Sequence, residues 1–253
     1  MAFEAVTVVT GWSPEGYVLY GRRFVQSFAR FWPRDVRLLV YVEEAERLPR
    51  GEQRIVSDVS AVKAFLERHR RNPKVNGRAP TEGWTEKDRR RSYSFRFDAW
   101  KFGRVPLYIR DAAREIERGI LIWLDGDVVT FKEVTPGLLR TVLPKGADVS
   151  YLGRKGYHSE IGFQGYRLPG ARPFIETFAE WYATDAFLHL DEWHSAHVFD
   201  ATRQACEVTG LRCHNLTPNG SGHVWFQSPL GAVMDHLKGD NRKARGWSLE
   251  RRR

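Results

Sequence analysis

The chain has 253 residues, and its 40 Lys and Arg against 31 Asp and Glu give a formal net charge of +9 at pH 7. Hydrophobic residues make up 42% of the chain and charged residues 28%, which excludes a disordered or low-complexity protein and fits one large domain with a buried core. No run approaches the roughly 18 consecutive apolar residues of a membrane span, and the opening MAFEAVTVVT has no basic segment, so we expect neither a span nor a secretory signal and take a cytoplasmic location as the default. The two cysteines, Cys206 and Cys213, suggest neither a disulfide framework nor a zinc site.

In the first part of the chain, strands are expected to alternate with helices. The apolar and β-branched runs predict strands at 5–10, 37–42 and 55–56, and helical spacing predicts helices over 24–31 and 60–70. This alternation argues for a parallel sheet with crossover helices. The stretch 72–91 has two prolines and two glycines among many charges, so we expect a loop there and consider it a candidate lid.

The second part continues the same α/β pattern. A helix is expected over 97–118 on both sides of Pro106, strands at 120–124, 148–152 and 161–166, and helices at 172–182 and 196–209, with 226–238 ending the ordered part. We find no internal repeat and no interdomain linker. The predicted architecture is one α/β domain built on a mixed, mostly parallel sheet flanked by helices.

The most informative string is ILIWLDGDVVTF at 120–131, in which Asp125 and Asp127 follow a buried strand. Open α/β sheets bind ligands at the carboxyl ends of their strands, and two hard oxygen donors suit Mg²⁺ or Mn²⁺ bound to a diphosphate. Gly126 lets the backbone approach such a ligand. The competing interpretation is an ordinary turn, because Asp and Gly are common turn residues.

A D-x-D after an apolar strand resembles the nucleotide-sugar glycosyltransferases of the GT-A fold, which is Rossmann-like. AVTVVTGW resembles the opening strand of that fold, and the resemblance implies that Thr10 and Gly11 lie near the donor nucleoside. FDAWKFGRVPLYIRDA at 97–112 precedes the D-x-D where glycogenin-like, retaining transferases carry a donor-binding Lys, matched here by Lys101.

HLKGDNRK at 236–243 is similar to the H-x-x-G-x-x-K string near the C-terminus of the same group. The resemblance implies that His236 completes a metal site with Asp125 and Asp127, and that Gly239 and Lys243 hold the diphosphate of a nucleoside diphosphate sugar, first of all a UDP-sugar. An imidazole beside two carboxylates leaves positions open for phosphate oxygens, and a lysine stabilises the charge that grows on the leaving diphosphate. The implied division is a nucleotide-binding half over 1–130, an acceptor half over 131–243 and a basic tail over 244–253.

The acceptor side is less sharply marked. SEIGFQGYRL resembles the floor of the acceptor pocket in GT-A enzymes, where Glu160 is a candidate to bind a hydroxyl group, the alternative being an edge-strand glutamate. HLDEWHSAHVFDATRQ lies where the class places a group near the anomeric carbon; our candidates are Asp191 and Glu192 as catalytic residues, with Trp193 and Asp200 as acceptor contacts. Acidic residues before a helix are also ordinary capping groups. If a general base activates the acceptor hydroxyl, transfer inverts the anomeric centre. The absence of such a base favours retention, and so does the resemblance to retaining transferases.

The basic surplus falls in two clusters, 87–96 and the tail beginning at Lys238. Each cluster is either a solvated surface or part of a groove for a polyanion. If a groove is present, its positive charge ranks a modified base in DNA ahead of a glycan or a protein as the acceptor. Two other functions stay open: a noncatalytic nucleic-acid-binding protein in which the D-x-D is a turn, and an enzyme that transfers a nucleotidyl or phosphoryl group.

Overall fold

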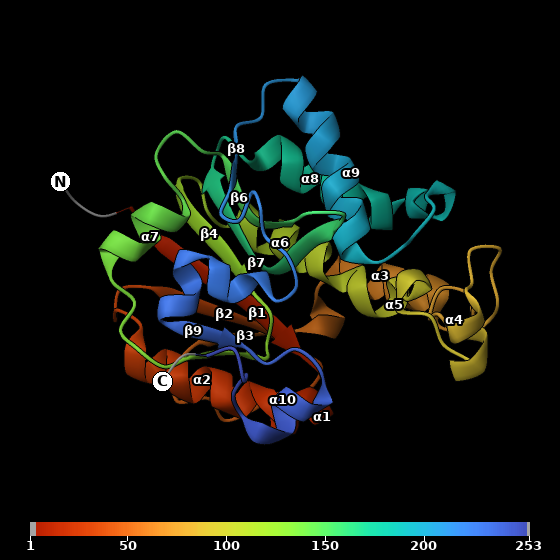
Figure 1. Cartoon of the computed structure of the whole chain (residues 1–253), viewed down its shortest axis with the longest axis horizontal. Coiled ribbons are helices and arrows are strands. Elements are labelled where there is room, and N and C mark those ends of the chain that lie inside the picture. Colours follow the sequence, from red (N-terminus) through yellow and green to blue (C-terminus); the bar gives the residue numbers. More distant parts are fainter. Residues whose placement is uncertain (1–3, 252–253) are drawn as a thin grey trace.

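A seven-stranded sheet in the order β3-β2-β1-β4-β7-β6-β8 crosses the computed structural model, which describes residues 4–251 (Figure 1). Its strands are β1 (Val6–Trp12), β2 (Arg37–Val42), β3 (Glu52–Ile55), β4 (Gly119–Leu124), β6 (Val149–Arg154), β7 (Tyr157–Leu168) and β8 (Cys213–Asn215). Neighbours pair in parallel except where β7 runs antiparallel to β4 and to β6. A second sheet joins β5 (Val128–Thr130) to β9 (Met234–His236) in antiparallel register.

Helices cover both faces of the large sheet (Figure 1). They are α1 (Pro14–Gly16), α2 (Arg22–Phe31), α3 (Ser60–His69), α4 (Glu86–Arg91), α5 (Ala99–Phe102), α6 (Arg104–Arg114), α7 (Pro136–Val142), α8 (Arg172–Ala183), α9 (Ser195–Val208) and α10 (Asp240–Arg245). The short turns are η1 (Tyr17–Gly21), η2 (Val56–Asp58), η3 (Phe95–Phe97), η4 (Ala186–His189), η5 (Val224–Gln227) and η6 (Pro229–Ala232). Within the described residues, no helix is both long enough and apolar enough to cross a bilayer.

The apolar strands are explained by two cores, one on each face of the sheet. Along β4, Leu121 and Trp123 pack with α3, α6, α8 and α9, while Ile120, Ile122 and Leu124 pack on the opposite face with α2, α7 and β9. Alternate side chains of a strand point to opposite faces, so a strand covered on both sides has no polar position. The predicted mixed, mostly parallel α/β sheet flanked by helices is confirmed.

Two expectations about local structure are wrong. The segment 72–91 is not all loop, because Thr85 and Asp88 form a reciprocal capping box that starts α4, and Trp84 is buried in the core. The helix expected over 97–118 breaks at Gly103, and Pro106 lies in the first turn of α6, where its missing N–H costs no helical hydrogen bond.

The C-terminal segment is also more ordered than predicted. The described chain does not end its regular structure at 238, since α10 follows, and Ser248 is fully buried against Asp235. The guanidinium of Arg251 lies 3.9 Å from the centre of the Phe131 ring. The expected basic tail over 244–253 is therefore packed on the domain as far as Arg251; Arg252 and Arg253 lie outside the described residues.

Candidate metal and donor site

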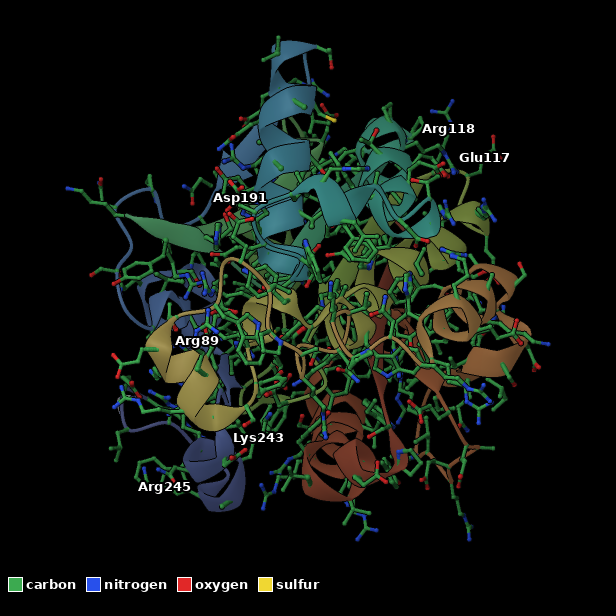
Figure 2. The ribbon with its side chains drawn as sticks, turned by 90° about the vertical axis from the view of Figure 1, so that its right-hand side faces the viewer. Arg89, Glu117, Arg118, Asp191, Lys243 and Arg245 are labelled. Atoms are coloured by element: carbon green, nitrogen blue, oxygen red, sulfur yellow. The ribbon has the colours of Figure 1, made fainter. Side chains whose placement is uncertain are left out.

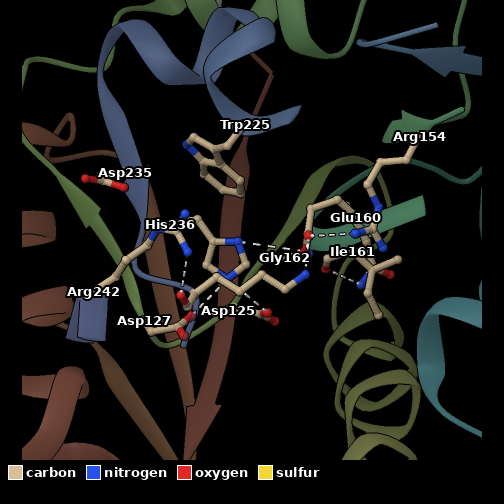
Figure 3. Close-up of polar contacts among 12 residues, drawn as sticks. Asp125, Asp127, Arg154, Glu160, Ile161, Gly162, Trp225, Asp235, His236 and Arg242 are labelled. Atoms are coloured by element: carbon tan, nitrogen blue, oxygen red, sulfur yellow. Dashed lines mark hydrogen bonds and ion pairs between the residues drawn. The ribbon is translucent and has the colours of Figure 1, made fainter. Parts of the chain in front are cut away.

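The two sheets bring the D-x-D and the distant histidine together. β4 ends at Leu124, Asp125 and Asp127 follow, and β5 then pairs with β9 so that Val128 lies opposite His236. The backbone N–H of Leu237 also donates to the carbonyl of Asp127, at 3.0 Å. Residues more than a hundred positions apart therefore meet at the carboxyl end of a central strand, as Figure 3 shows.

The three side chains converge on a small volume, which we call the D-x-D site (Asp125, Asp127 and His236). His236 Nε2 lies 3.1 Å from Asp127 Oδ1 and 3.5 Å from Asp125 Oδ2. One ligand atom from each residue lies within 4.8 Å of the other two. His236 and Asp127 are buried, whereas the side chain of Asp125 is 35% exposed, so the site opens to solvent on the Asp125 side.

Neighbouring groups fix these side chains in place. Trp123 Nε1 donates to Asp125 Oδ1 at 2.9 Å, and the Trp225 ring lies 5.1 Å from that of His236. Gly162 on β7 leaves room for the imidazole, because a Cβ there would lie only 2.5 Å from His236 Cε1. Indirect partners of this kind hold metal ligands in their binding orientation.

The charged side chains of the D-x-D site lie so close together that each shifts the pKa of its neighbours. Burial opposes the charged form of His236, yet the nearby Asp127 carboxylate raises the pKa of His236 to about 10. Burial likewise opposes the charged form of Asp127, but His236 and Lys243 hold the pKa of Asp127 well below its usual range. Burial, Asp127 and Asp125 together raise the pKa of Tyr20 to about 12, so this hydroxyl stays protonated at neutral pH.

The residues fit a divalent cation. Two carboxylates and one imidazole suit Mn²⁺ or Mg²⁺, and phosphate oxygens or waters would fill the remaining positions. His236 Nδ1 is buried without a hydrogen-bond partner in the described part of the chain, and the nearest carboxylate oxygen recorded for it is Glu160 Oε1 at 3.8 Å. Nε2, which faces both aspartates, is thus the imidazole nitrogen available for a metal.

Some of the predicted donor residues lie at this site. Lys243 Nζ is 3.0 Å from Asp127 Oδ2 and 4.9 Å from the centre of the Tyr20 ring. Gly239, at φ 84°, is the N-cap residue directly before α10, the helix that carries Lys243. Positive φ is a conformation that glycine adopts without a steric penalty.

Thr10 and Gly11 occupy the carboxyl end of β1, next to β4. A Cβ on Gly126 would lie 3.2 Å from the carbonyl oxygen of Gly11, so this strand end contacts the D-x-D turn. Thr10 Oγ1 is buried and has no hydrogen-bond partner within residues 4–251. Lys101 is exposed on α5, with Nζ 5.2 Å from the centre of the Phe102 ring, and its donor role stays a prediction.

Glu160 lies beside the D-x-D site. It is buried on β7, accepts from Lys238 Nζ at 2.5 Å and lies 3.8 Å from Arg154 Nη1. Despite the opposing effect of burial, His236, Lys238 and Arg154 lower the pKa of Glu160 to about 2. Sequence reasoning missed both partners because they come from distant segments: the antiparallel pairing of β6 with β7 brings Arg154 near Glu160, and Lys238 reaches it from the segment after β9.

The remaining acceptor and catalytic candidates gather before and on α9. Asp191 is exposed, while Trp193 packs in the core, with its Nε1 donating to the carbonyl of Leu190 at 3.1 Å. Asp200 accepts from Ser159 Oγ at 2.6 Å and so ties α9 to the start of β7. A hollow of about 470 Å³ is bordered by Asp191, Glu192 and Trp193 together with residues of the 81–97 segment.

Glu192 is flanked by two imidazoles. Its Oε2 lies 2.8 Å from His194 Nε2 and 3.3 Å from His158 Nε2, and its Oε1 lies 3.5 Å from Arg96. Burial would raise the pKa of Glu192, but hydrogen bonds from His158 and His194 hold it well below the usual range. Sequence reasoning selected neither histidine, although His194 lies in the string HLDEWHSAHVFDATRQ, from which Asp191 and Glu192 were selected.

Searches against protein-family models and against curated proteins give no match for this chain. Among solved structures, the chain is similar to the apo form of mouse xyloside xylosyltransferase 1, at 14% identity and a TM-score of 0.49, over 83% of this chain and 84% of that one. It is also similar to a glycosyltransferase involved in the glycosylation of the major capsid of PBCV-1, at 12% identity and a TM-score of 0.49, over 95% of this chain and 99% of that one.

Proposed function

We propose that this chain is a metal-dependent glycosyltransferase of the GT-A type that transfers a sugar from a nucleoside diphosphate sugar to a hydroxyl acceptor. The observation that carries the proposal is the convergence of Asp125, Asp127 and His236 at the carboxyl end of β4, with Lys243 next to them. Open α/β sheets bind nucleotides at this edge. The turn interpretation of the D-x-D does not account for a buried histidine beside it or for the ion pair of Lys243 with Asp127.

The donor diphosphate would lie between the D-x-D site and α10. Asp125, Asp127 and His236 Nε2 would hold Mn²⁺ or Mg²⁺, which supplies positive charge to the phosphate oxygens as the bond to the sugar breaks. Lys243 adds a second cation there, and its contact with the Tyr20 ring keeps its side chain at the site. We propose that Thr10 and Gly11, at the neighbouring end of β1, contact the nucleoside and that this nucleoside is uridine.

We propose that transfer retains the anomeric configuration of a hexose. An inverting enzyme needs a general base, and such a base works best with a pKa near the working pH. The low pKa of Glu192 and its engagement by His158, His194 and Arg96 make it a weak base. Glu192 and Asp191 are better suited to stabilise positive charge on the sugar, with Glu160 and Asp200 on the acceptor side.

For the acceptor we keep a hydroxyl of a glycan, a protein or a modified DNA base. In Figure 2, Arg89, Lys243 and Arg245 lie on one side of the molecule together with Asp191. Part of the C-terminal basic cluster is neutralised within the fold, since Arg242 pairs with Glu250 at 2.5 Å. If DNA is the acceptor, the protein should bind DNA with an affinity that falls steeply as the salt concentration rises. A protein that does not bind DNA at low salt would exclude DNA as the acceptor.

The test is release of UDP from UDP-sugars in the presence of Mn²⁺. Without an acceptor, wild type should hydrolyse the UDP-sugar slowly and release UDP. Asp127→Asn should release UDP at a rate at least about 100-fold lower than wild type. Asp58→Asn, which alters an exposed aspartate on η2, is the matched control and should match wild type. Equal release by Asp127→Asn and wild type would refute the metal site.

Product analysis separates the alternatives. A glycosylated product supports the proposal, whereas a nucleotidylated or phosphorylated product assigns the same site to nucleotidyl or phosphoryl transfer. Salt-dependent DNA binding with no response to nucleotide or Mn²⁺ indicates a noncatalytic nucleic-acid-binding protein.

A further inference from the structure

A second group of metal-ligating side chains lies next to the D-x-D site. His158 on β7, Glu192 in the loop before α9 and His194 at the start of α9, together the histidine cluster, each offer one ligand atom within 4.8 Å of the other two. The shared atom is Glu192 Oε2, which faces both Nε2 atoms. Two segments of the chain, the start of β7 and the residues that lead into α9, thus present two imidazole nitrogens and one carboxylate oxygen to one point.

The position of Asp200 beside His158 resembles the surroundings of histidines in protein metal sites. His158 Nδ1 faces Asp200 Oδ2 at 4.0 Å while its Nε2 faces Glu192. A metal-bound histidine commonly directs its other nitrogen toward a carboxylate, which fixes the tautomer. Asp200 is itself held by Ser159, so its position does not depend on His158.

Access also suits metal binding. The side chain of His158 is 35% exposed and that of His194 only 7%, so the cluster is open on one side and anchored on the other. The His197 ring lies 4.9 Å from that of His158 and offers a further nitrogen close by.

The donor set differs from that of the D-x-D site. Two imidazoles and one carboxylate are a common catalytic zinc set, whereas Mg²⁺ and Mn²⁺ favour carboxylate oxygens and water. Two cations lie near: Arg96 contacts the other Glu192 oxygen, and Arg154 pairs with Glu160. Arg96 leaves Oε2 free for a metal and holds the carboxylate in position.

We propose that the histidine cluster is a second metal site that binds Zn²⁺, separate from the D-x-D site and not dependent on the proposed function. Bound Zn²⁺ cross-links the start of β7 to the start of α9, which adds to the link that Asp200 and Ser159 already make. Glu192 is also a candidate catalytic residue, so the test measures metal binding and stability rather than sugar transfer.

The experiment uses the full chain carrying Asp125→Asn and Asp127→Asn, which disables the D-x-D site. This background should bind one Zn²⁺ per chain, and Co²⁺ in its place should give the intense visible absorption of a low-coordinate N/O site. At a 100-fold excess over Kd, Zn²⁺ should raise Tm by about 5–10 °C.

Adding His158→Asn or Glu192→Gln should weaken Zn²⁺ binding at least about tenfold and abolish the Co²⁺ absorption. The matched control is His189→Asn, which alters an exposed histidine on η4 and should bind Zn²⁺ as tightly as the background. The Tm of each variant without metal confirms that it folds. Zn²⁺ binding that is absent from the background, or that survives both cluster substitutions, overturns the proposal.

Discussion

Ser248→Ala tests whether the C-terminal segment is a fixed part of the fold. Ser248 is fully buried, its Oγ donates to Asp235 Oδ1 at 2.6 Å and its backbone N–H donates to Asp235 Oδ2 at 2.7 Å. Asp235 is only 1% exposed and precedes His236 on β9. The substitution removes one of these donors and leaves a buried carboxylate partly unsatisfied, with little change in volume.

A hydrogen bond to a charged group contributes about 1.5–3 kcal/mol, so Ser248→Ala should lower the free energy of unfolding by about 2 kcal/mol. For a chain of this size, that corresponds to a Tm lower by about 4–8 °C, measured by calorimetry or thermal shift. Since the same segment carries α10, we also expect weaker Mn²⁺ binding in titration calorimetry.

The control is Ser221→Ala, because Ser221 is exposed and its contacts with Gln227 use only its backbone. It should unfold at the wild-type Tm. A Ser248→Ala protein with the same Tm as wild type would show that the segment does not pack on Asp235 and would refute the reasoning.

Three other predictions follow from single contacts. Gly162→Ala should weaken Mn²⁺ binding at least about tenfold by displacing the His236 ring, whereas Gly146→Ala, where a Cβ meets no atom within 4 Å, should bind as wild type does; equal affinities would refute the close fit. Trp123→Phe should also weaken Mn²⁺ binding about tenfold in titration calorimetry, because Asp125 loses its indole donor, and an unchanged Kd would contradict a positioning role. Burial raises the pKa of Asp88, but Thr85 and Arg96 outweigh burial and lower this pKa to about 2. The charged form of Asp88 therefore stabilises the fold fully above the ordinary Asp pKa of about 4, and this stabilisation is lost as pH falls through 2. The amide NMR signals of residues 86–91 should show loss of α4 between pH 4 and 2 in wild type and its loss at both pH values in Asp88→Asn; wild-type α4 signals that do not change with pH would contradict this.

The sequence predicted the central part of the fold because it depends on local patterns. A wholly apolar run such as 120–124 indicates a strand buried on both faces, and a D-x-D after it must lie at the carboxyl edge of the sheet. The contact of His236 with Asp127 was predicted from the resemblance, and the pairing of β5 with β9 accounts for it.

The rest depends on contacts between distant segments, which periodicity does not encode. The partners of Glu160 come from β6 and from the segment after β9, and those of Glu192 from β7 and η3. The packing of the C-terminal segment includes a buried serine and a cation–π contact of Arg251 in a stretch whose composition is that of a solvated tail. Short polar side chains in irregular segments leave no pattern in the sequence.

Crystals grown with UDP and Mn²⁺ provide the most direct test of the central claim, that Asp125, Asp127 and His236 bind the metal that holds the donor diphosphate. The account predicts an anomalous-scattering peak within bonding distance of the two carboxylates and His236 Nε2, with the diphosphate between the metal and Lys243. A metal bound elsewhere, or a diphosphate that contacts neither the metal nor Lys243, would contradict it.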